Sequence, residues 1–407
     1  MPRPLSHIRV LDLSRILAGP WATQNLADLG AEVIKIERPG AGDDTRNWGP
    51  PFLKDAEGRE TRESAYYLSV NRGKKSVTLD ISTPDGARIA RELAARSDVL
   101  IENYKVGGLA KYGLAYDDVR KLNPRIVYCS ITGFGQTGPN AHRPGYDFIF
   151  QGMGGLMSIT GERDELPGGG PQKVGIAITD VLAGMYASLA ITAAITHRER
   201  TGEGQYIDVA LLDTIVAFGA NQIFNYFTSG QLPKRYGNAH ANLLPYEVFQ
   251  TADGHLILAC GNDSQFASFC KAAERSGLAE DARFCTMPDR IRNRAELIPL
   301  VGEIMKGRTS KEWIARLEAA NVPCGPINNY KEVFEDPQVR HRGLKIGIPH
   351  PISGAMPGIA NPMRFSATPV TYDMPPPLLG QHTREVLSDL LGIDDAEIQR
   401  LRKAGAV

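Results

Sequence analysis

The sequence predicts an α/β protein with a large domain built on a mainly parallel sheet and a smaller α+β domain. The chain has 407 residues, which is long for a single hydrophobic core. Short β-rich runs alternate with helical patterns over roughly the first 200 residues, as in βαβ units. The pattern changes near Tyr226, where a polar loop leads into a hairpin. We expect the large domain to comprise residues 1–225 and 326–407, and the small domain residues 226–325.

Six β-rich runs are the expected strands of the large domain. They are Ile8–Leu13, Glu32–Glu37, Ser76–Ile81, Val99–Glu102, Arg125–Thr132 and Val174–Thr179. Helical patterns lie between some of these strands, at Trp21–Leu29, Pro84–Arg96 and Tyr116–Leu122. Thr83 fits the N-cap of the second helix, and Pro84 fits its first turn. This alternation predicts a sheet that helices cover on both faces.

The remaining segments show weaker patterns. Arg38–Thr61 is rich in Gly, Pro, Asp and Arg and has no hydrophobic period, which predicts a long functional loop. In the small domain, Tyr246–Thr251 and His255–Cys260 predict a hairpin that turns at an Asp-Gly pair. A Pro/Gly-rich stretch, His350–Gly380, precedes helices that we expect from Thr383 onward.

Composition argues against several classes of protein. The chain carries 46 Lys and Arg and 46 Asp and Glu residues, so no overall basic charge indicates binding to nucleic acid or an anionic membrane. Its five cysteines are scattered without a Cys-x-x-Cys pair, which disfavours disulfides and zinc and favours the cytoplasm. The eight histidines are dispersed, so no metal site is expected. We recognise no signal segment and no run of about 18 apolar residues that predicts a membrane span.

The segment Gly133–Gly138 matches the G-x-G-x-x-G pattern of dinucleotide-binding loops and follows an expected strand. That pattern also requires a helix that begins on the glycines. Pro139 and Pro144 follow instead, and no helical period is present. We therefore expect a loop whose backbone lines some other ligand.

Basic residues gather near the ends of the first strands. They are Arg15, Arg38, Arg72, Lys74 and Lys75. Open α/β sheets bind ligands at the carboxyl ends of their strands, and cations there suit a phosphorylated ligand. A solvated face that balances nearby acids is equally compatible, and the sequence leaves both interpretations open.

Asp180 lies between the apolar run Val174–Thr179 and a long helix that begins at Val181. This helix is rich in small residues, so it can pack closely on a sheet or on a partner chain. A carboxylate at a helix start faces unpaired N–H groups and the positive end of the helix dipole, and both favour its ionised form. Such a carboxylate is either a helix cap or a nucleophile, and the residues alone leave that choice open.

The whole chain resembles the family III CoA-transferases. The matching segments follow one another from one end of the chain to the other: Val10–Leu13, Ala18–Pro20, Gly30–Glu37, Glu102–Tyr104, Asn123–Arg125, Gly145–Asp147, Thr179–Asp180, Pro323–Pro326 and Leu378–Thr383. Within the family, three segments are most similar to the succinate–hydroxymethylglutarate CoA-transferase group: Pro245-Tyr246, Ile327–Asn329 and Pro375–Thr383.

The resemblance implies that Asp180 is the catalytic nucleophile. Its carboxylate attacks an acyl-CoA thioester to form an acyl-aspartyl anhydride, and the CoA thiolate returns to form an aspartyl-CoA thioester. An acceptor carboxylate then attacks this thioester to give a second anhydride, from which the new acyl-CoA forms. Coenzyme A and acyl-CoA are substrates in this scheme, which implies no prosthetic group and no metal.

The resemblance also assigns residues to the ligands. The residues implied for CoA are Leu17, Ala18, Arg38, Leu79, Asn103, Tyr104 and Lys111. Tyr146 and Asp147 are expected near the reacting centre, and Arg46 and His240 are our candidates for binding the acceptor acid.

A Rossmann-like large domain and an interlocked homodimer are further implications of the resemblance. The expected partners are acyl-CoA and small carboxylic acids, with succinyl-CoA and dicarboxylates favoured. An acyl-CoA racemase on the same scaffold is one alternative, but Tyr146 stands where the racemases carry a histidine, and tyrosine is a far weaker base near neutral pH. The other alternative is a CoA-binding protein without turnover, in which Asp180 only caps its helix.

Overall fold

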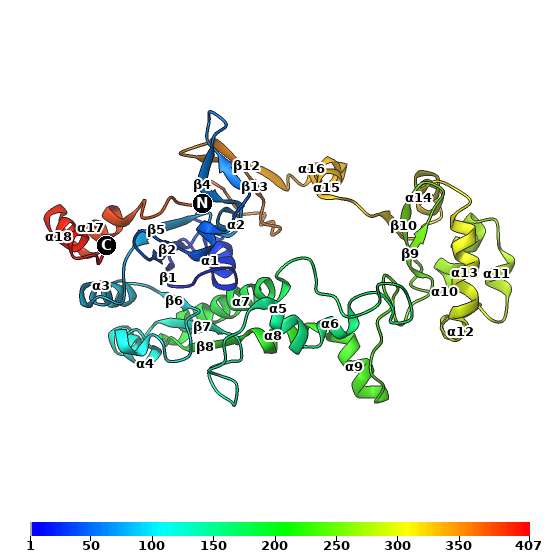
Figure 1. The fold of residues 1–407 in the computed structure, drawn as a ribbon, viewed down its shortest axis with the longest axis horizontal. Helices are drawn as coiled ribbons and strands as arrows, with labels where there is room; N and C mark the ends of the chain where they lie inside the picture. Colours follow the sequence, from blue (N-terminus) through cyan, green and yellow to red (C-terminus); the bar gives the residue numbers. More distant parts are fainter. Residues whose placement is uncertain (1) are drawn as a thin grey trace. The chain divides into compact units, whose positions relative to one another are not determined.

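Contacts within the chain divide it into two units. The structure, a computed structural model, describes residues 2–407 (Figure 1). Unit 1 consists of the chain up to Leu156 together with Val174–Phe224 and Val339–Val407, and unit 2 consists of Met157–Lys173 and Asn225–Gln338. Residues 157–173 and 326–338, which the sequence predicts in the large domain, belong by their contacts to unit 2.

A six-stranded parallel sheet forms the centre of unit 1. In spatial order its strands are β5 (Lys74–Thr78), β2 (Glu32–Glu37), β1 (Arg9–Asp12), β6 (Val99–Glu102), β7 (Val127–Thr132) and β8 (Tyr206–Ala210). Numbered along the chain, this order is 3-2-1-4-5-6, as in Rossmann folds. The predicted α/β class and the parallel sheet are therefore confirmed. The order reverses between β1 and β6, and ligands bind such sheets outside the carboxyl ends of the strands at this reversal.

One expected strand is absent, and one observed strand was missed. The run Val174–Thr179 is largely a loop, and helix α7 (Ile178–Thr201) begins within it. The sixth strand is β8, which pairs with β7 instead. Its central Asp208 is exposed and interrupts the apolar run, so the hydrophobic pattern did not reveal this strand.

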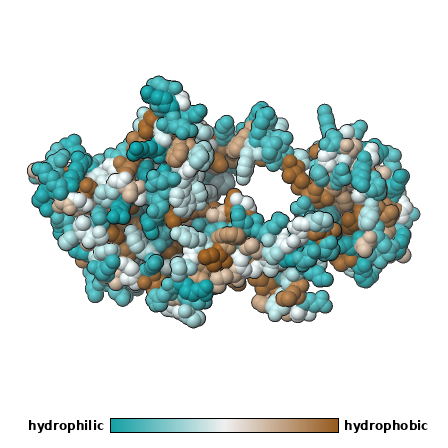
Figure 2. All heavy atoms as spheres, in the orientation of Figure 1, coloured by the Kyte–Doolittle hydropathy of each residue, from teal (hydrophilic) through white to brown (hydrophobic). Residues whose placement is uncertain are grey.

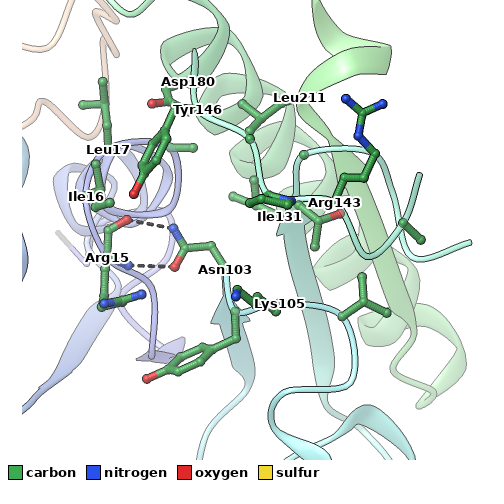
Figure 3. A pocket seen from close by; sticks show the side chains of 18 of the residues that line it. Arg15, Ile16, Leu17, Asn103, Lys105, Ile131, Arg143, Tyr146, Asp180 and Leu211 are labelled. Carbon is green, nitrogen blue, oxygen red and sulfur yellow. Dashed lines mark hydrogen bonds between the residues drawn. The ribbon is translucent and has the colours of Figure 1, made fainter. Parts of the chain in front are cut away.

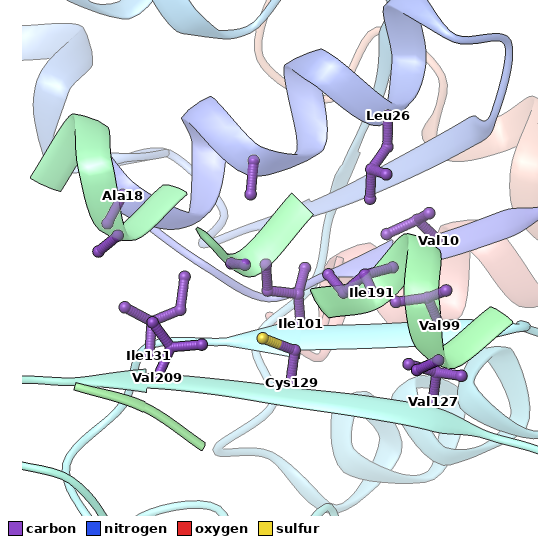
Figure 4. Packing of buried hydrophobic residues seen from close by; sticks show 14 of the residues in the cluster. Val10, Ala18, Leu26, Val99, Ile101, Val127, Cys129, Ile131, Ile191 and Val209 are labelled. Carbon is purple, nitrogen blue, oxygen red and sulfur yellow. The ribbon is translucent and has the colours of Figure 1, made fainter. Parts of the chain in front are cut away.

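Helices bury both faces of the sheet. Alternate strand residues point to opposite faces, so Val10 and Ile101 belong to one core and Leu11 and Leu100 to the other. Helices α1 (Ala18–Asp28) and α7 cover the first face (Figure 4). The second face is covered by α3 (Pro84–Ala95), α4 (Tyr116–Leu122), α17 (Thr383–Leu391) and α18 (Asp395–Lys403). The predicted Thr83 cap of α3 is confirmed, since its hydroxyl accepts the Gly86 N–H.

Small residues let α7 approach α1 closely. A Cβ at Gly184 would lie 2.5 Å from the carbonyl oxygen of Ala18, so only glycine fits there. Ala187, Ile191 and Ala194 bury the following turns in the core. By length and composition alone this helix is apolar enough to cross a membrane, contrary to the sequence expectation. Its buried face accounts for part of that apolar composition.

The long expected loop Arg38–Thr61 contains regular structure. It includes a 3-10 helix, Asp44–Asn47, and most of a hairpin of β3 (Phe52–Lys54) and β4 (Glu60–Ser64). The other elements of unit 1 are α2 (Ala65–Val70), a 3-10 helix (Ala110–Tyr112), α5 (Asp147–Met153), α8 (Leu211–Phe218), β12 (Lys345–His350) and β13 (Gly354–Ile359). Three helices span the boundaries of the units: α6 (Leu156–Ile159), α9 (Ala220–Ser229) and α16 (Pro337–His341).

A three-stranded antiparallel sheet forms the centre of unit 2. The predicted hairpin is confirmed as β9 (Tyr246–Gln250) and β10 (His255–Ala259), and β11 (Cys324–Pro326) pairs with β10. The helices of this unit are α10 (Asp263–Ala272), α11 (Gly277–Glu280), α12 (Met287–Arg292), α13 (Arg294–Met305), α14 (Ser310–Ala319) and α15 (Tyr330–Glu335). Aromatic residues such as Phe266 and Trp313 fill the core between sheet and helices.

Candidate active site

A cavity opens in unit 1 where the strand order reverses. Its walls are Arg15–Ala18 after β1, Asn103–Val106 after β6 and Ile131–Gly133 at the end of β7. Ala141–Tyr146, Asp180 and Leu211 complete the lining, and the cavity encloses about 230 Å³ (Figure 3). This is the place at which open α/β sheets bind ligands.

Asp180 lies in the first turn of α7 but does not cap it. The carboxylate of Asp147 accepts the N–H groups of Thr179, at 2.7 Å, and of Asp180, at 3.3 Å. Asp180 instead lines the cavity, and no donor within residues 2–407 binds its carboxylate. The helix cap that the sequence left as an alternative for Asp180 is therefore the role of Asp147.

The pKa of Asp180 is raised to about 7, first by burial and then by the charge of Asp147. From its place at a helix start, Asp180 is expected to favour its ionised form. That expectation is wrong, because Asp147 occupies the N–H donors and places a second negative charge beside Asp180. Near neutral pH, Asp180 therefore exists in both its protonated and its ionised forms.

The Gly145-Tyr146-Asp147 motif is packed against Phe150. A Cβ at Gly145 would lie 2.3 Å from the ring of Phe150, which is fully buried. Helix α5 begins at Asp147, and the side chain of Gln151 one turn later donates to Asp147 Oδ2 at 2.7 Å. These contacts hold the Asp147 carboxylate in place, while Tyr146 is 67% exposed on the cavity wall.

Six residues predicted for CoA or for the reacting centre line this one cavity. They are Leu17, Ala18, Asn103, Tyr104, Tyr146 and Asp180. The side chain of Asn103 accepts the Arg15 N–H at 2.9 Å and donates to the Arg15 carbonyl oxygen at 2.8 Å (Figure 3). Asn103 thus holds the loop after β1.

Three residues predicted for CoA do not line the cavity. Leu79 is buried in the core of the sheet's second face. Arg38 is exposed directly after β2, where it assists the Ser82 hydroxyl in lowering the pKa of Asp80. Lys111 is also exposed, and its ammonium lies 4.8 Å from the centre of the Tyr112 ring. Their roles in CoA binding stay predictions.

The predicted basic cluster separates into two groups, with Arg15 and Arg38 after the ends of β1 and β2 and the other three residues at the opposite end of the sheet. Arg15 lines the cavity, where Asp44 pairs with it at 2.9 Å. Arg72, Lys74 and Lys75 lie at the amino end of β5, at the edge of the sheet opposite the cavity. Each of the three has an acidic partner: Asp28 at 2.6 Å, Asp12 at 3.4 Å and Glu32 at 2.9 Å, respectively. These three cations therefore balance nearby acids, but Arg72 and Lys74 are buried, so the expected solvated face is wrong for them.

Arg46 is not available to a substrate. Its guanidinium donates to both carboxylate oxygens of Glu37, each at 2.8 Å. It also donates to the Tyr67 hydroxyl at 2.7 Å and to the Pro377 carbonyl oxygen at 3.0 Å. The prediction that Arg46 binds the acceptor is therefore wrong, because its donors are satisfied inside the protein. His240 belongs to unit 2, and its role stays a prediction.

The sequence patterns did not identify two cations that line the cavity, nor a tyrosine on which the charge of Asp180 acts. Lys105 and Arg143 line the cavity. Burial, followed by the charges of Asp180 and Asp147, raises the pKa of Tyr66 to about 12. Lys105 directly follows a matched Asn-Tyr pair and could have been found by adjacency. Tyr66 is remote in the chain, and no pattern identified it.

The glycine-rich segment is a loop, as predicted. No helix begins between Gly133 and Gly138, and Gly133 lines the cavity. The Gln136 N–H in this loop binds the Asp208 carboxylate at 2.9 Å. Across residues 2–407, no group of three His, Cys, Asp or Glu side chains is placed to hold a metal ion.

Comparison with known proteins identifies the family. The model of CoA-transferase family III matches residues 5–383. A succinate–glutarate CoA-transferase of Agrobacterium fabrum is 49% identical over 391 residues, which cover 96% of each chain. A succinyl-CoA:glutarate CoA-transferase of Mus musculus is 46% identical over 407 residues, which cover 100% of this chain and 90% of the mouse protein.

A solved structure supports the same assignment. The crystal structure of a CAIB/BAIF family protein from Brucella suis is 47% identical, with a TM-score of 0.84. The match covers 96% of this chain and 100% of the other. The chain therefore belongs to CoA-transferase family III, as its resemblance predicted, and is a CoA-transferase.

Proposed function

We propose that this enzyme moves CoA from succinyl-CoA to a dicarboxylic acid of the glutarate class, with Asp180 as the nucleophile. One observation carries this role for Asp180: its carboxylate lines the cavity at the strand reversal, and Asp147 rather than Asp180 caps the helix. The substrates are supported by the names of the bacterial and mouse relatives, both of which refer to succinate or succinyl-CoA and to glutarate.

The proposed reaction starts from ionised Asp180. Its oxygen attacks the thioester carbonyl of succinyl-CoA, the C–S bond breaks, and a succinyl-aspartyl anhydride and CoA thiolate result. The thiolate attacks the aspartyl carbonyl, which releases succinate and leaves an aspartyl-CoA thioester. The acceptor carboxylate then forms a second anhydride, and the thiolate takes its acyl group and restores Asp180. At each step one anion reacts and another is released, so the series of reactions requires no net proton transfer.

Each addition places negative charge on a carbonyl oxygen, which N–H donors stabilise. The first turn of α1 is our proposed source of these donors, because no side chain caps it and Ala18 lines the cavity. The dipole of α1 acts in the same sense. Lys105 and Arg143 are the cavity cations that we propose for the phosphates of CoA.

A transfer assay tests the proposed function. The purified enzyme is incubated with succinyl-CoA and with a panel of mono- and dicarboxylic acids, and new CoA esters are identified by mass spectrometry. We expect glutaryl-CoA from glutarate and little product from monocarboxylates. Exchange of α-hydrogen for deuterium in an acyl-CoA, without movement of CoA between acids, would indicate the racemase alternative.

The rate of transfer should rise with pH through about 7. Only ionised Asp180 is nucleophilic, and since its pKa is about 7, kcat/KM should fall roughly tenfold per pH unit below that value. Asp147→Asn keeps an oxygen that can accept the Thr179 N–H but removes a negative charge beside Asp180, so it should lower the pKa of Asp180. Profiles of kcat/KM against pH for both proteins check this. A midpoint that stays in place or moves to higher pH in the variant contradicts the role of Asp147.

We also propose that the enzyme is a homodimer, as its resemblance implies. Large apolar side chains reach the surface (Figure 2). Helices α7 and α8, which contact each other in unit 1, expose five of them by between 43% and 67%: Met185, Tyr186, Leu189, Val216 and Phe218. Exposed apolar groups on adjoining helices favour a protein interface. Light scattering should give twice the chain mass of 44.3 kDa, and a single-chain mass would contradict the dimer.

A further inference from the structure

Ile16 adopts a backbone conformation that β-branched residues rarely adopt. Its φ is +72°, in the left-handed region, where the Cβ of an L-residue is crowded. Such strain persists only where the surrounding structure enforces it, and it gathers at functional sites. Ile16 lines the cavity that contains Asp180 and directly precedes Leu17 and Ala18. Neighbouring groups must therefore hold Ile16 in this conformation.

Asp43 holds Ile16 from one side. Both of its carboxylate oxygens accept the Ile16 N–H, at 3.3 and 3.2 Å. The ammonium of Lys35 donates to Asp43 at 2.9 Å and to the Ser14 carbonyl oxygen at 2.9 Å. The backbone N–H of Thr45 also donates to Asp43, at 3.0 Å. The side chains of Lys35 and Asp43 are fully buried, so this pair ties the loop after β1 to the core.

The pair keeps its charges at every pH of a normal assay. Burial alone would raise the pKa of Asp43, but the Lys35 ammonium and the Thr45 donors lower it to about 2. Burial alone would lower the pKa of Lys35, but the carboxylates of Asp43, Asp12 and Glu37 raise it above its ordinary value. The pair therefore does not titrate in the range where Asp180 does.

Asn103 holds the preceding residue from the other side. Its side chain brackets Arg15 through the N–H and the carbonyl oxygen, as described above (Figure 3). Asn103 follows β6 and Asp43 lies beyond β2, the two strands that flank β1 in the sheet. The short loop between β1 and α1 is thus fastened from both neighbouring strands.

We propose that the buried Asp43–Lys35 pair is a positioning device for CoA transfer. Together with Asn103 it enforces the left-handed conformation of Ile16 and thereby sets the first turn of α1 on the wall of the Asp180 cavity. This inference rests on the proposed function, since it assumes that the α1 N–H groups stabilise the reaction at Asp180. The pair itself touches no substrate and acts through the backbone of the loop.

Removing the charge of Asp43 tests the device. In Asp43→Asn the Ile16 N–H loses one of its two acceptor oxygens and the ion pair with Lys35 is broken. We expect kcat to fall roughly tenfold while the KM for succinyl-CoA changes less. Misplaced N–H donors reduce the stabilisation of the transition state more than they reduce substrate binding. Asp28→Asn is the matched control: Asp28 is equally buried and pairs with Arg72 at 2.6 Å, but it lies at the far end of α1. Its kcat should stay within about twofold of the wild type.

A comparison of Ile16→Gly with Ile16→Ala distinguishes a loss of positioning from a general loss of structure. Ile16→Gly removes the penalty of a positive φ, whereas Ile16→Ala removes the side chain but keeps the Cβ that causes the penalty. When each is combined with Asp43→Asn, the glycine variant should recover at least about threefold in kcat and the alanine variant should not. Equal kcat values for the two double variants would overturn the proposal.

A thermal measurement keeps the test decisive if Asp43→Asn fails to fold. In the otherwise unchanged protein, Ile16→Gly should unfold at a higher temperature than Ile16→Ala, the reverse of the usual order for these residues. A lower Tm for the glycine variant would overturn the enforced strain. An absence of CoA transfer by the unaltered enzyme would refute the proposed function instead, and the order of the two Tm values would still show whether the conformation of Ile16 is enforced.

Discussion

Replacing Asp180 by asparagine is expected to abolish CoA transfer and to leave the protein folded. The amide has nearly the shape of the carboxylate but is not nucleophilic, and loss of a covalent nucleophile lowers kcat by at least about 10⁴-fold. CoA binding should persist, because the rest of the cavity wall is unchanged. The measurement is glutaryl-CoA formation from succinyl-CoA and glutarate. Turnover near that of the wild type would eliminate Asp180 as the nucleophile.

The same variant should be more stable than the wild type above neutral pH. Burial and the charge of Asp147 raise the pKa of Asp180 from its ordinary 3.8 to about 7, so the folded protein binds this proton more tightly than the unfolded chain. The stability of the wild type therefore falls as the pH rises from about 4 to about 7, and asparagine escapes this loss. Thermal unfolding at pH 8 should give a higher Tm for Asp180→Asn, and a lower Tm would contradict the raised pKa. Asp389→Asn, at an exposed position of α17, should alter neither rate nor Tm.

Arg46→Met is expected to destabilise the protein by about 3 kcal/mol, because it leaves a buried carboxylate without its partner. Arg46 donates to both oxygens of Glu37, and its guanidinium lies 3.7 Å from the centre of the Tyr67 ring. Burial alone would raise the pKa of Glu37, and Arg46 is the main reason that it is lowered instead. Unfolding by urea, followed by fluorescence, measures the loss.

Two further variants show whether the ion pair causes that loss. Adding Glu37→Gln to Arg46→Met removes the stranded charge and should recover part of the stability. Arg283→Met breaks two ion pairs of an exposed guanidinium, with Asp281 and Glu296, and should have little effect. If Arg46 bound the acceptor acid, Arg46→Met would instead raise the KM for dicarboxylates without a loss of stability.

Local sequence patterns were sufficient for most of the sheet. Glu32–Glu37 and Val99–Glu102 are strands at the predicted residues, because apolar runs buried on both faces identify central parallel strands. The same rule failed for Val174–Thr179, which forms a loop and the start of α7, and for β8, whose exposed Asp208 interrupts its run. A run of apolar residues does not show whether a neighbouring strand is present to pair with it.

The sequence by itself determined the family, the α/β fold and the choice of Asp180 as the candidate nucleophile. Short motifs and hydrophobic periodicity suffice for this because they are local properties of the chain. Only the tertiary structure decided that Asp147 caps α7, that the pKa of Asp180 is raised to about 7, and that Arg46 belongs to a buried ion pair. A cap, a pKa and an ion pair depend on distances between groups that are far apart in the sequence and on the water excluded around them. Folding alone sets those distances.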